Sequence, residues 1–338
     1  MPVVRNGEDR YESSVAERPR LLQCVVPLLS VLVLGGFADG HLAAAQKGVM
    51  AFSSVEEQVN QYSSSWQTDP NVAHLDDDVY GIFWSGLQRD AARPGLEGIH
   101  GRQFTRDGIA KNELESLVDT SNRHSNIGPS VARVAPTTFA VTWLEFNESD
   151  RPDDTLFLRL VDDQEVPIGD DWEFADGLAV PDYWQNAGST FPDGLVVAWT
   201  RSVDSQVTAD ASVVLTRRFD ATGAAATEEI EVTSIADSQP TRAQVAGLLD
   251  RSWVVVWMEL FVDTPDSDGV LLRRYAADGT PLGDAEVVNS HTAGAQRYPS
   301  VASFADGRFL VAWESLGQDG SDWGIFAQRY DASAAKGG

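Results

Sequence analysis

Cysteine and lysine are nearly absent from this sequence of 338 residues. The single cysteine, Cys24, lies in an N-terminal apolar stretch, so no intrachain disulfide can form and the fold must be held by packing. Three lysines leave arginine as the main positive residue, against 51 acidic residues and a formal net charge of −26. Nucleic acid is therefore not an expected partner, because its phosphates require basic patches. The negative net charge is compatible with binding of cations, basic proteins or neutral sugars.

Catalytic and cofactor signatures are also missing. The sequence contains no GxSxG, no phosphate-cradling glycine loop, no dinucleotide-binding fingerprint, no HExxH and no CxxC. The five histidines are scattered. His124 and His291 occupy equivalent positions in a repeat described below, which makes them candidate ligand-binding residues, although repetition alone also explains them.

Long hydrophobic runs are confined to the N-terminus. Residues 21–34 are apolar, Gly35 and Gly36 interrupt the run, and small-residue cleavage sites follow. The run is shorter than the ~20 residues of a spanning helix, so we interpret 1–45 as a signal peptide. An uncleaved N-terminal membrane anchor is the alternative. The predicted location is outside the cytoplasm, in the periplasm, at the cell surface or in the medium, with 46–338 as a single domain.

Tryptophan reveals an internal repeat. Trp84, Trp143, Trp199, Trp257 and Trp313 each end an apolar run, at steps of 59, 56, 58 and 56. A second mark, an aromatic or β-branched residue preceded by Arg, Gln or Leu, keeps nearly the same period at Phe104, Val161, Phe219, Tyr275 and Tyr330. Self-similarity at a fixed period indicates a repeat architecture.

Each repeat is predicted to contain four strands. The first follows a proline, the second carries the tryptophan, the third carries the second mark, and the fourth is short. The second strands are near-continuous apolar runs, as expected for burial on both faces. The five predicted blades lie near 70–119, 129–176, 181–233, 240–289 and 299–332.

The fifth repeat has no fourth strand of its own in the sequence. Residues 57–60 resemble 286–289, and Asn60 precedes Pro70 by the ten residues that separate Asn289 from Pro299. An N-terminal strand at 56–60 is therefore expected to complete the last blade. Pairing the first strand with the last removes the exposed sheet edge. We predict an all-β, five-bladed β-propeller, in preference to an open solenoid or stacked sandwiches.

The best-formed repeat, 286–332, reads EVVN, then PSVA, VAWES and GIFAQRYDA. It resembles the β-propeller-like repeats of large bacterial extracellular proteins, which often also carry RTX calcium repeats. The likeness is looser over 55–285. It implies export and a propeller, and it implies no particular reaction. The glycine-rich RTX nonapeptide itself is absent.

The connections between second and third strands are long and acidic, and a propeller gathers them on one face. Carboxylates that converge there are candidate ligands for Ca²⁺, which takes several oxygen ligands. The candidates are Asp263, Asp266, Asp268, Asp319 and Asp322. The alternative is that these are solvated hairpin tips.

Trp66, Trp172, Trp184 and Trp323 fall outside the repeat register, and of these Trp323 and Trp66 are candidate platforms for stacking a sugar. The five repeated tryptophans are interpreted as packing between blades. Glu145, Glu259 and Glu314 follow their tryptophans, and a pair of carboxylates at suitable separation could hydrolyse a glycoside. Their recurrence favours a structural role, because a catalytic site breaks repeat symmetry.

These observations predict an exported, monomeric, non-enzymatic propeller that recognises a glycan or an extracellular protein through its acidic loop face. The alternative is a propeller-type polysaccharide hydrolase that uses paired carboxylates. A purely structural module is a third hypothesis.

Overall fold

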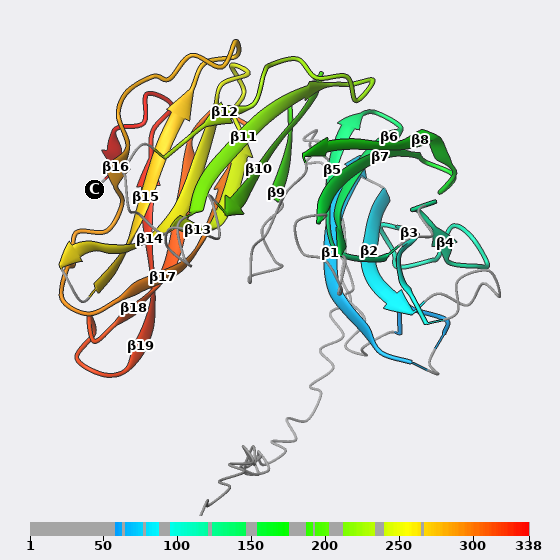
Figure 1. Cartoon of the computed structure of the whole chain (residues 1–338), viewed down its shortest axis with the longest axis horizontal. Helices are drawn as coiled ribbons and strands as arrows, with labels where there is room; N and C mark the ends of the chain where they lie inside the picture. Colours follow the sequence, from blue (N-terminus) through cyan, green and yellow to red (C-terminus); the bar gives the residue numbers. More distant parts are fainter. Residues whose placement is uncertain are drawn as a thin grey trace, which may run out of the picture. The chain divides into compact units, whose positions relative to one another are not determined.

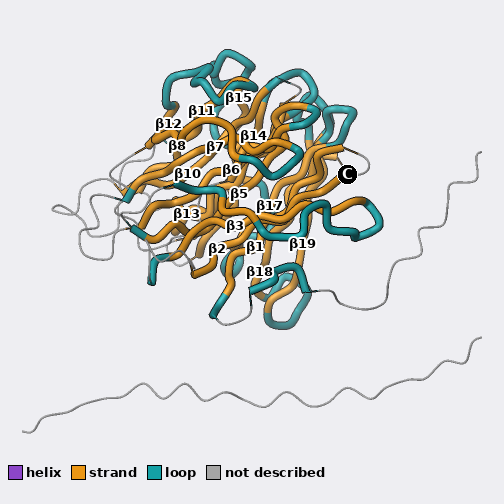
Figure 2. The backbone as a smooth tube through the Cα atoms, turned by 90° about the vertical axis from the view of Figure 1, so that its right-hand side faces the viewer, coloured by secondary structure: helices purple, strands orange, loops and turns teal. Residues whose placement is uncertain are grey.

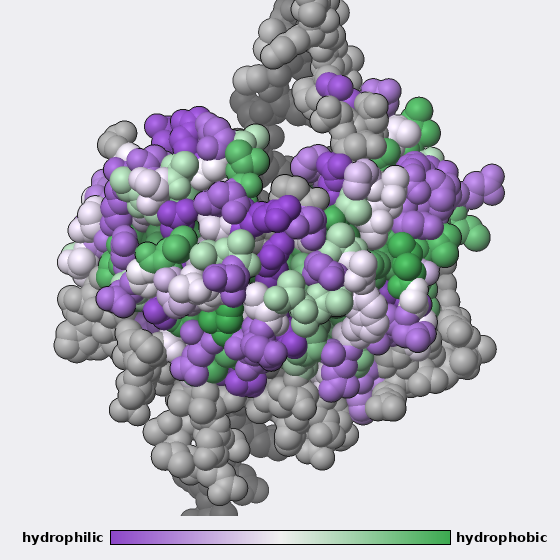
Figure 3. Space-filling view, turned by 90° about the horizontal axis from the view of Figure 1, so that it is seen from above, coloured by the Kyte–Doolittle hydropathy of each residue, from purple (hydrophilic) through white to green (hydrophobic). Residues whose placement is uncertain are grey.

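A computed structural model describes residues 58–62, 65–76, 79–87, 95–120, 124–146, 154–175, 187–191, 193–202, 212–233, 240–264 and 267–337. These residues are all-β and contain no helix (Figures 1 and 2), hence none that could cross a membrane. Residues 56–338 form one compact unit. The expected signal or anchor at 1–45 lies outside the described residues. Hydrophobic residues form separate patches among hydrophilic ones on the face in Figure 3.

Five antiparallel four-stranded sheets make up the unit, and each sheet takes four successive strands of the chain. We number these sheets as blades 1 to 5. Their strands are β1 (Gln67–Asp76), β2 (Val79–Leu87), β3 (Glu97–Thr105), β4 (Ser116–Leu117); β5 (Ser125–Ala135), β6 (Thr138–Phe146), β7 (Thr155–Asp162), β8 (Pro167–Ala175); β9 (Ala187–Phe191), β10 (Gly194–Ser202), β11 (Ser212–Asp220), β12 (Ile230–Glu231); β13 (Pro240–Gly247), β14 (Trp253–Thr264), β15 (Ser267–Tyr275), β16 (Glu286–Val287); and β17 (Gln296–Ser303), β18 (Phe309–Leu316), β19 (Trp323–Tyr330), β20 (Lys336–Gly337).

Successive blades pack face to face through the repeated aromatic residues. In the first of these interfaces, Phe83 and Ile99 of blade 1 pack with Phe139 and Trp143 of blade 2. Comparable clusters join blades 2 and 3, 3 and 4, and 4 and 5. All five repeat tryptophans are buried. Four of them, Trp143, Trp199, Trp257 and Trp313, lie in clusters that join successive blades, which confirms their predicted place. The five four-stranded sheets confirm the predicted five-bladed propeller.

In blades 1 and 2 the indole N–H of the repeat tryptophan has an equivalent acceptor. Trp84 donates to Gln67 Oε1 at 2.9 Å and Trp143 donates to Asn126 Oδ1 at 3.1 Å, in each case to the residue 17 positions earlier. An amide oxygen there satisfies a buried donor that would otherwise be costly to leave unpaired.

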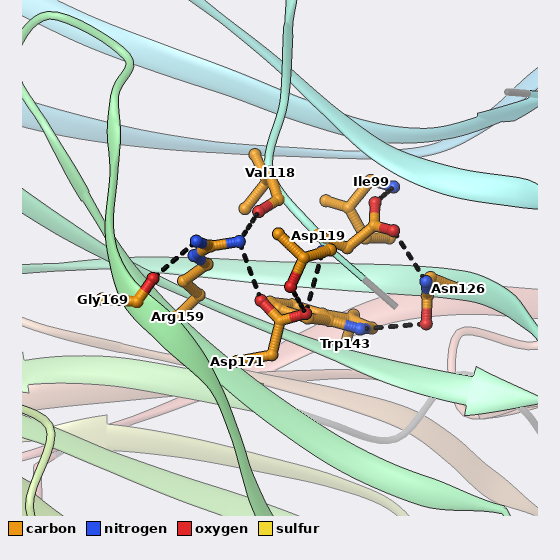
Figure 4. Close-up of polar contacts among 9 residues, drawn as sticks. Ile99, Val118, Asp119, Asn126, Trp143, Arg159, Gly169 and Asp171 are labelled. Atoms are coloured by element: carbon orange, nitrogen blue, oxygen red, sulfur yellow. Dashed lines mark hydrogen bonds and ion pairs between the residues drawn. The ribbon is translucent and has the colours of Figure 1, made fainter. Parts of the chain in front are cut away.

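Figure 4 shows how this acceptor is tied to the preceding blade. Asp119, just after β4 of blade 1, accepts the backbone N–H of Ile99 at 2.6 Å and the side-chain N–H of Asn126 at 2.8 Å. Asn126 in turn accepts the indole of Trp143. In blade 4, Asn289 takes the place of Asp119, accepting the N–H of Val270 at 2.9 Å. The fourth strand of one blade is thereby linked to the core of the next.

The fifth blade differs from the expectation that an N-terminal strand at 56–60 completes it. Its fourth strand is β20, which pairs with Arg329 and Tyr330. Lys336 lies six residues after Tyr330, the spacing at which Phe104, Phe219 and Tyr275 form bridges in the turns of blades 1, 3 and 4. β20 thus corresponds to that turn segment rather than to the fourth strands of the other blades. Residues 58–60 belong to no strand, and 56–57 lie outside the described residues.

Residues 58–60 nevertheless contact blade 1 as the fourth strand of a preceding blade would. Arg102 of β3 donates to the carbonyl of Val59 at 2.9 Å. Arg159 donates in the same way to Val118, the residue that follows β4, at 2.9 Å. Asn60 donates to the carbonyl two residues ahead, as Asn289 does. The sequence equivalence of Asn60 and Asn289 therefore extends to their local contacts.

Candidate functional site

The innermost strands of all five blades line one cavity of about 350 Å³, which marks the central channel of the propeller. Its polar lining comes from Asp69 and Asn71 of β1, Ser130 of β5 and Gln244 of β13. Blade 3 contributes Gly188 and blade 5 contributes Val301. This is a place in the described structure where residues of every blade converge.

Four of the five inner strands carry a β-bulge near this cavity. The ladder register shifts between Thr68 and Asn71 in blade 1, and at the equivalent points of blades 2, 4 and 5. One bulge residue in each case has left-handed backbone geometry: Asp69 (φ 56°), Gly128 (φ 61°), Arg242 (φ 57°) and Tyr298 (φ 53°). Bulges redirect side chains and are frequent beside active sites.

These four positions are equivalent in backbone but different in chemistry. The repeat places an acid in blade 1, glycine in blade 2, a base in blade 4 and a phenol in blade 5. A left-handed conformation costs a non-glycine residue roughly 1–2 kcal/mol, and only blade 2 avoids that cost. Strained residues of this kind cluster at binding and catalytic sites. The mouth of the channel is therefore where the repeat symmetry of the propeller is broken.

Asp69 is the carboxylate that lines the cavity among the described residues. Burial raises the pKa of Asp69, while hydrogen bonds from Thr68, Ser85 and the N–H of Gly128 act to lower it. The Thr68 hydroxyl lies 3.1 Å from Oδ2. A desolvated carboxyl group with a raised pKa can carry and transfer a proton closer to neutral pH than an exposed one.

Hydrogen bonds between blades fix the walls around Asp69. The backbone N–H of Gly128 donates to Ser85 Oγ at 2.9 Å, and that of Val131 donates to Asn71 Oδ1 at 3.1 Å. The N–H of Gly188 donates to Ser130 Oγ at 3.2 Å. Blades 1, 2 and 3 are thus joined at the channel itself, which provides the rigid support that a binding or catalytic side chain needs.

Two arginine–aromatic pairs lie at this end of blades 4 and 5. The guanidinium of Arg242 lies over the ring of Tyr298, 5.0 Å from its centroid. Arg297 lies over Trp323 at 5.5 Å, and its Nε also donates to Asp268 Oδ2 at 2.5 Å. The charge of Arg297 is therefore balanced within the protein. No such carboxylate accompanies Arg242 among the described residues.

A second cavity, of about 430 Å³, is lined by the turns that follow the inner strands of blades 2, 4 and 5. Its lining includes Arg133, Leu249 and Phe304. It contains no carboxylate from the described residues, so it offers less for acid–base chemistry than the cavity at Asp69.

The predicted ligand-binding residues are not brought together as one group. Trp323 begins β19 and is 42 % exposed beneath Arg297, whereas Trp66 precedes β1 and is 50 % exposed. His124 and His291 are half-buried, and the backbone carbonyl of His291 accepts the side chain of Asn289 at 2.9 Å. Among the described residues, no hydrogen bond or ring contact joins these two histidines to either tryptophan.

The predicted calcium ligands are engaged locally where they are described. Asp268 is buried against Arg297, and Asp319 accepts the N–H of Ser321 at 3.1 Å. Asp322 uses its backbone carbonyl to accept Gly317. Asp266 and the side chain of Asp263 lie outside the described residues. Within the described part of the chain, no group of three or more possible metal ligands occurs, and calcium binding stays a prediction.

The three glutamates near the tryptophans have different environments. Glu259 is fully buried and accepts the indole N–H of Trp257 at 2.9 Å. Glu145 is buried opposite Asn126. Glu314 is half-buried opposite Arg297 and is one position closer to its tryptophan, so it is not equivalent to the other two. Of the three, solvent best reaches Glu314.

Comparisons with known proteins support the propeller. No protein-family model and no curated protein matches the sequence. Among solved structures, an α-L-arabinanase from Penicillium chrysogenum with arabinobiose has a TM-score of 0.53 at 12 % identity, over 77 % of this chain and 80 % of its own. An α-L-arabinofuranosidase from Fusarium graminearum has 0.51 at 14 %, over 76 % and 79 %. An ulvan lyase has 0.53 at 9 %, over 79 % and 68 %. At such identities the likeness concerns the fold.

These comparisons correct the expectation of a non-enzymatic binding propeller. The solved propellers that this chain resembles are an arabinanase, an arabinofuranosidase and a polysaccharide lyase, so the propeller fold gives no ground for expecting a non-enzymatic protein. The absence of contiguous catalytic signatures does not exclude an enzyme, because a propeller can build a site from separate blades. Such a site leaves no contiguous motif in the sequence.

The functional candidates that sequence reasoning missed are Asp69, Arg242 and Tyr298. One signal was available: Asp69, Gly128 and Tyr298 each precede a proline. Proline lacks an N–H for the ladder and within a sheet is found at bulges or edges. Pro70, Pro129 and Pro299, which were interpreted as preceding the first strands, lie in the bulges, whereas Pro240 begins β13.

Proposed function

We propose that this chain is a carbohydrate-active enzyme that cleaves a polysaccharide at the mouth of its central channel, with Asp69 as a catalytic proton-transfer residue. The observation that carries the proposal is the loss of repeat symmetry at the inner-strand bulges. Equivalent backbone positions there hold Asp69, Gly128, Arg242 and Tyr298. Asp69 and Gly128 line the cavity, and Arg242 and Tyr298 precede the lining residues Gln244 and Val301 of the same strands.

The environment of Asp69 suits general acid catalysis. Burial raises the pKa of Asp69, so the protonated form persists to a higher pH than for an exposed carboxyl group. In hydrolysis, the protonated acid gives its proton to the glycosidic oxygen as the bond to the anomeric carbon breaks. Water supplies the oxygen that bonds to that carbon, and a second carboxylate accepts the proton of the water in an inverting reaction.

Glu314 is our candidate for the second carboxylate. It is the half-buried member of the three glutamates, and it comes from blade 5, whose inner strand lines the same cavity as Asp69. Glu259 is unsuitable because its carboxylate is buried and accepts the Trp257 indole.

The setting of the enzyme follows from the same proposal. A polysaccharide substrate agrees with the predicted export through residues 1–45, and places the chain in the periplasm, at the cell surface or in the medium. We also propose that this chain is related to the bacterial extracellular proteins whose β-propeller-like repeats its sequence resembles.

The test is a screen of the full chain against neutral and acidic polysaccharides, with new reducing ends as the readout. We expect at least one substrate to be cleaved, and Asp69→Asn to slow cleavage by about 10²–10⁴-fold, the usual contribution of a general acid. Cleavage that is undiminished in Asp69→Asn would remove the proposed role of this residue.

A further inference from the structure

Arg242 is a half-buried arginine for which the described structure provides no counter-charge. Its guanidinium lies over the ring of Tyr298 at 5.0 Å. No carboxylate of the described residues forms an ion pair with it. A guanidinium that loses part of its hydration without gaining an acceptor is energetically unfavourable. An oxyanion from outside the protein would supply that acceptor.

The backbone at Arg242 gives an independent reason to assign it a function. Its φ of 57° is in the left-handed region, which glycine adopts without cost and which Gly128 adopts at the same point of blade 2. Tyr298 adopts it in blade 5 at 53°. Two large side chains therefore occupy strained positions and lie against each other, in the bulges of two inner strands that line the cavity further along.

Arg297 provides an internal comparison. It also lies over an aromatic ring, that of Trp323, but Asp268 accepts its Nε at 2.5 Å and Glu314 lies opposite it in the ladder. In that pair the protein itself supplies the counter-charge of the arginine. In the pair formed by Arg242 and Tyr298 no described acid supplies one, and its position near the channel suits a substrate.

We propose that the substrate is an acidic polysaccharide, and that Arg242 binds an oxyanion on the sugar ring, a carboxylate or a sulfate ester, while Tyr298 packs against the sugar. The planar guanidinium matches either oxyanion with two parallel hydrogen bonds. The proposal rests on the proposed function, because it names the substrate class of that same site.

The net charge of −26 does not prevent such binding. At physiological ionic strength, charges separated by more than about 8 Å are largely screened at an exposed surface. The charges close to the subsite then affect binding of an anion more than the net charge of the whole chain does. The acid nearest to Arg242 in its own ladder is Glu259, which lies opposite Pro240 and accepts the Trp257 indole.

The experiment compares acidic polysaccharides with matched neutral forms. The full chain carrying Asp69→Asn, which blocks turnover, is titrated with polygalacturonate and its methyl ester, with glucuronoxylan and its carboxyl-reduced form, and with dextran sulfate and dextran. We expect binding to at least one acidic member and at least tenfold weaker binding to its neutral partner. Arg242→Gln should weaken that binding about tenfold or more, the usual effect of losing a hydrogen-bonded charge pair.

The matched control is Arg308→Gln. Arg308 also lies over an aromatic ring, Phe304, at 5.6 Å, but in the turn that precedes β18, where it pairs with Asp306. Its loss should leave binding unchanged. Carboxylate and sulfate are separated by which of the three polymer pairs responds.

The outcomes separate this inference from the proposed function. Cleavage of neutral polysaccharides with no preference for acidic ones would overturn the proposed oxyanion subsite but support the proposed enzymatic function. Binding of an acidic polysaccharide that depends on Arg242, without turnover by the wild-type chain, would support the subsite and overturn the enzymatic function. Equal loss of binding in Arg242→Gln and Arg308→Gln, or no binding to any acidic member, would overturn the subsite.

Discussion

The carboxylate of Glu259 accepts the indole N–H of Trp257, with 2.9 Å between Oε2 and Nε1. In blades 1 and 2 an amide 17 residues before the tryptophan has this role. Blade 4 has Pro240 at that position, which has no side-chain acceptor, and Glu259 lies opposite Pro240 in the ladder. Glu259 is therefore a structural replacement for the missing amide.

The role of Glu259 predicts a contrast between two substitutions. Glu259→Leu leaves the indole unpaired and should lower the free energy of unfolding by about 1–3 kcal/mol. Glu259→Gln keeps an acceptor oxygen and should be much milder. Urea unfolding of both variants measures the difference. A Glu259→Leu variant as stable as the wild type would show that the hydrogen bond contributes nothing.

The relay from Ile99 through Asp119 and Asn126 to Trp143 should behave as one unit (Figure 4). Asp119→Ala removes a buried acceptor from two donors and is expected to cost about 3 kcal/mol of unfolding free energy. Because the groups share a network, the double variant with Asn126→Ala should lose less than the sum of the two single losses. Strict additivity in a double-mutant cycle would argue against the relay.

Residues 58–62 should be held on blade 1 by Arg102. Arg102 donates a hydrogen bond to the carbonyl of Val59. Two further bonds hold the segment: the backbone N–H of Gln61 donates to the Glu115 side chain, and the backbone N–H of Glu115 donates to the Gln61 side chain. We expect Arg102→Leu to speed hydrogen exchange at the amide of Gln61. Arg217, at the same ladder position of blade 3, donates to Thr227 instead, so Arg217→Leu is the control. Equal exchange in both variants would contradict the assignment.

The raised pKa of Asp69 predicts how stability depends on pH. Burial makes the folded state bind this proton more tightly than the unfolded state. The protonated group is tolerated at low pH, and stability falls as the pH rises above the unfolded value toward the raised pKa. Asp69→Asn removes that penalty, and asparagine tolerates a positive φ.

We therefore expect Asp69→Asn to be at least as stable as the wild type at pH 7, with its relative advantage smallest near pH 3. Denaturant titrations of both proteins at the two pH values test this. A variant that is destabilised at pH 7 would mean that the carboxylate stabilises the fold.

The periodic part of the fold could be predicted from the sequence because each blade needs a large aromatic residue at the same place in its core. Trp143, Trp199 and Trp257 are buried for that reason. The amide 17 residues before the tryptophan could also have been predicted: Gln67 and Asn126 accept the indole N–H, whereas Gln296 accepts the side chain of Asn289. The strand at 56–60 was expected from the likeness of 57–60 to 286–289. Residues 58–60 form no strand and 56–57 lie outside the described residues, but Asn60 shares the local contact of Asn289.

The site could not be predicted in the same way because its position depends on backbone geometry. Asp69, Arg242 and Tyr298 share a left-handed bulge but no chemical property. The recurrence of residue types along the repeat therefore does not mark these positions, whereas it does mark the acidic loops. Asp268 looked like a metal ligand in sequence, whereas its buried ion pair with Arg297 is a contact between blades that spacing along the chain does not reveal.

The most direct test of the account is the rate at which the full chain and its Asp69→Asn variant release reducing ends from the same polysaccharide, each checked for folding by thermal unfolding. The account predicts cleavage by the wild type and a rate about 10²–10⁴-fold lower in a variant that is equally well folded. Equal rates in the two folded proteins would place the chemistry elsewhere and contradict the assignment of the channel mouth as the active site.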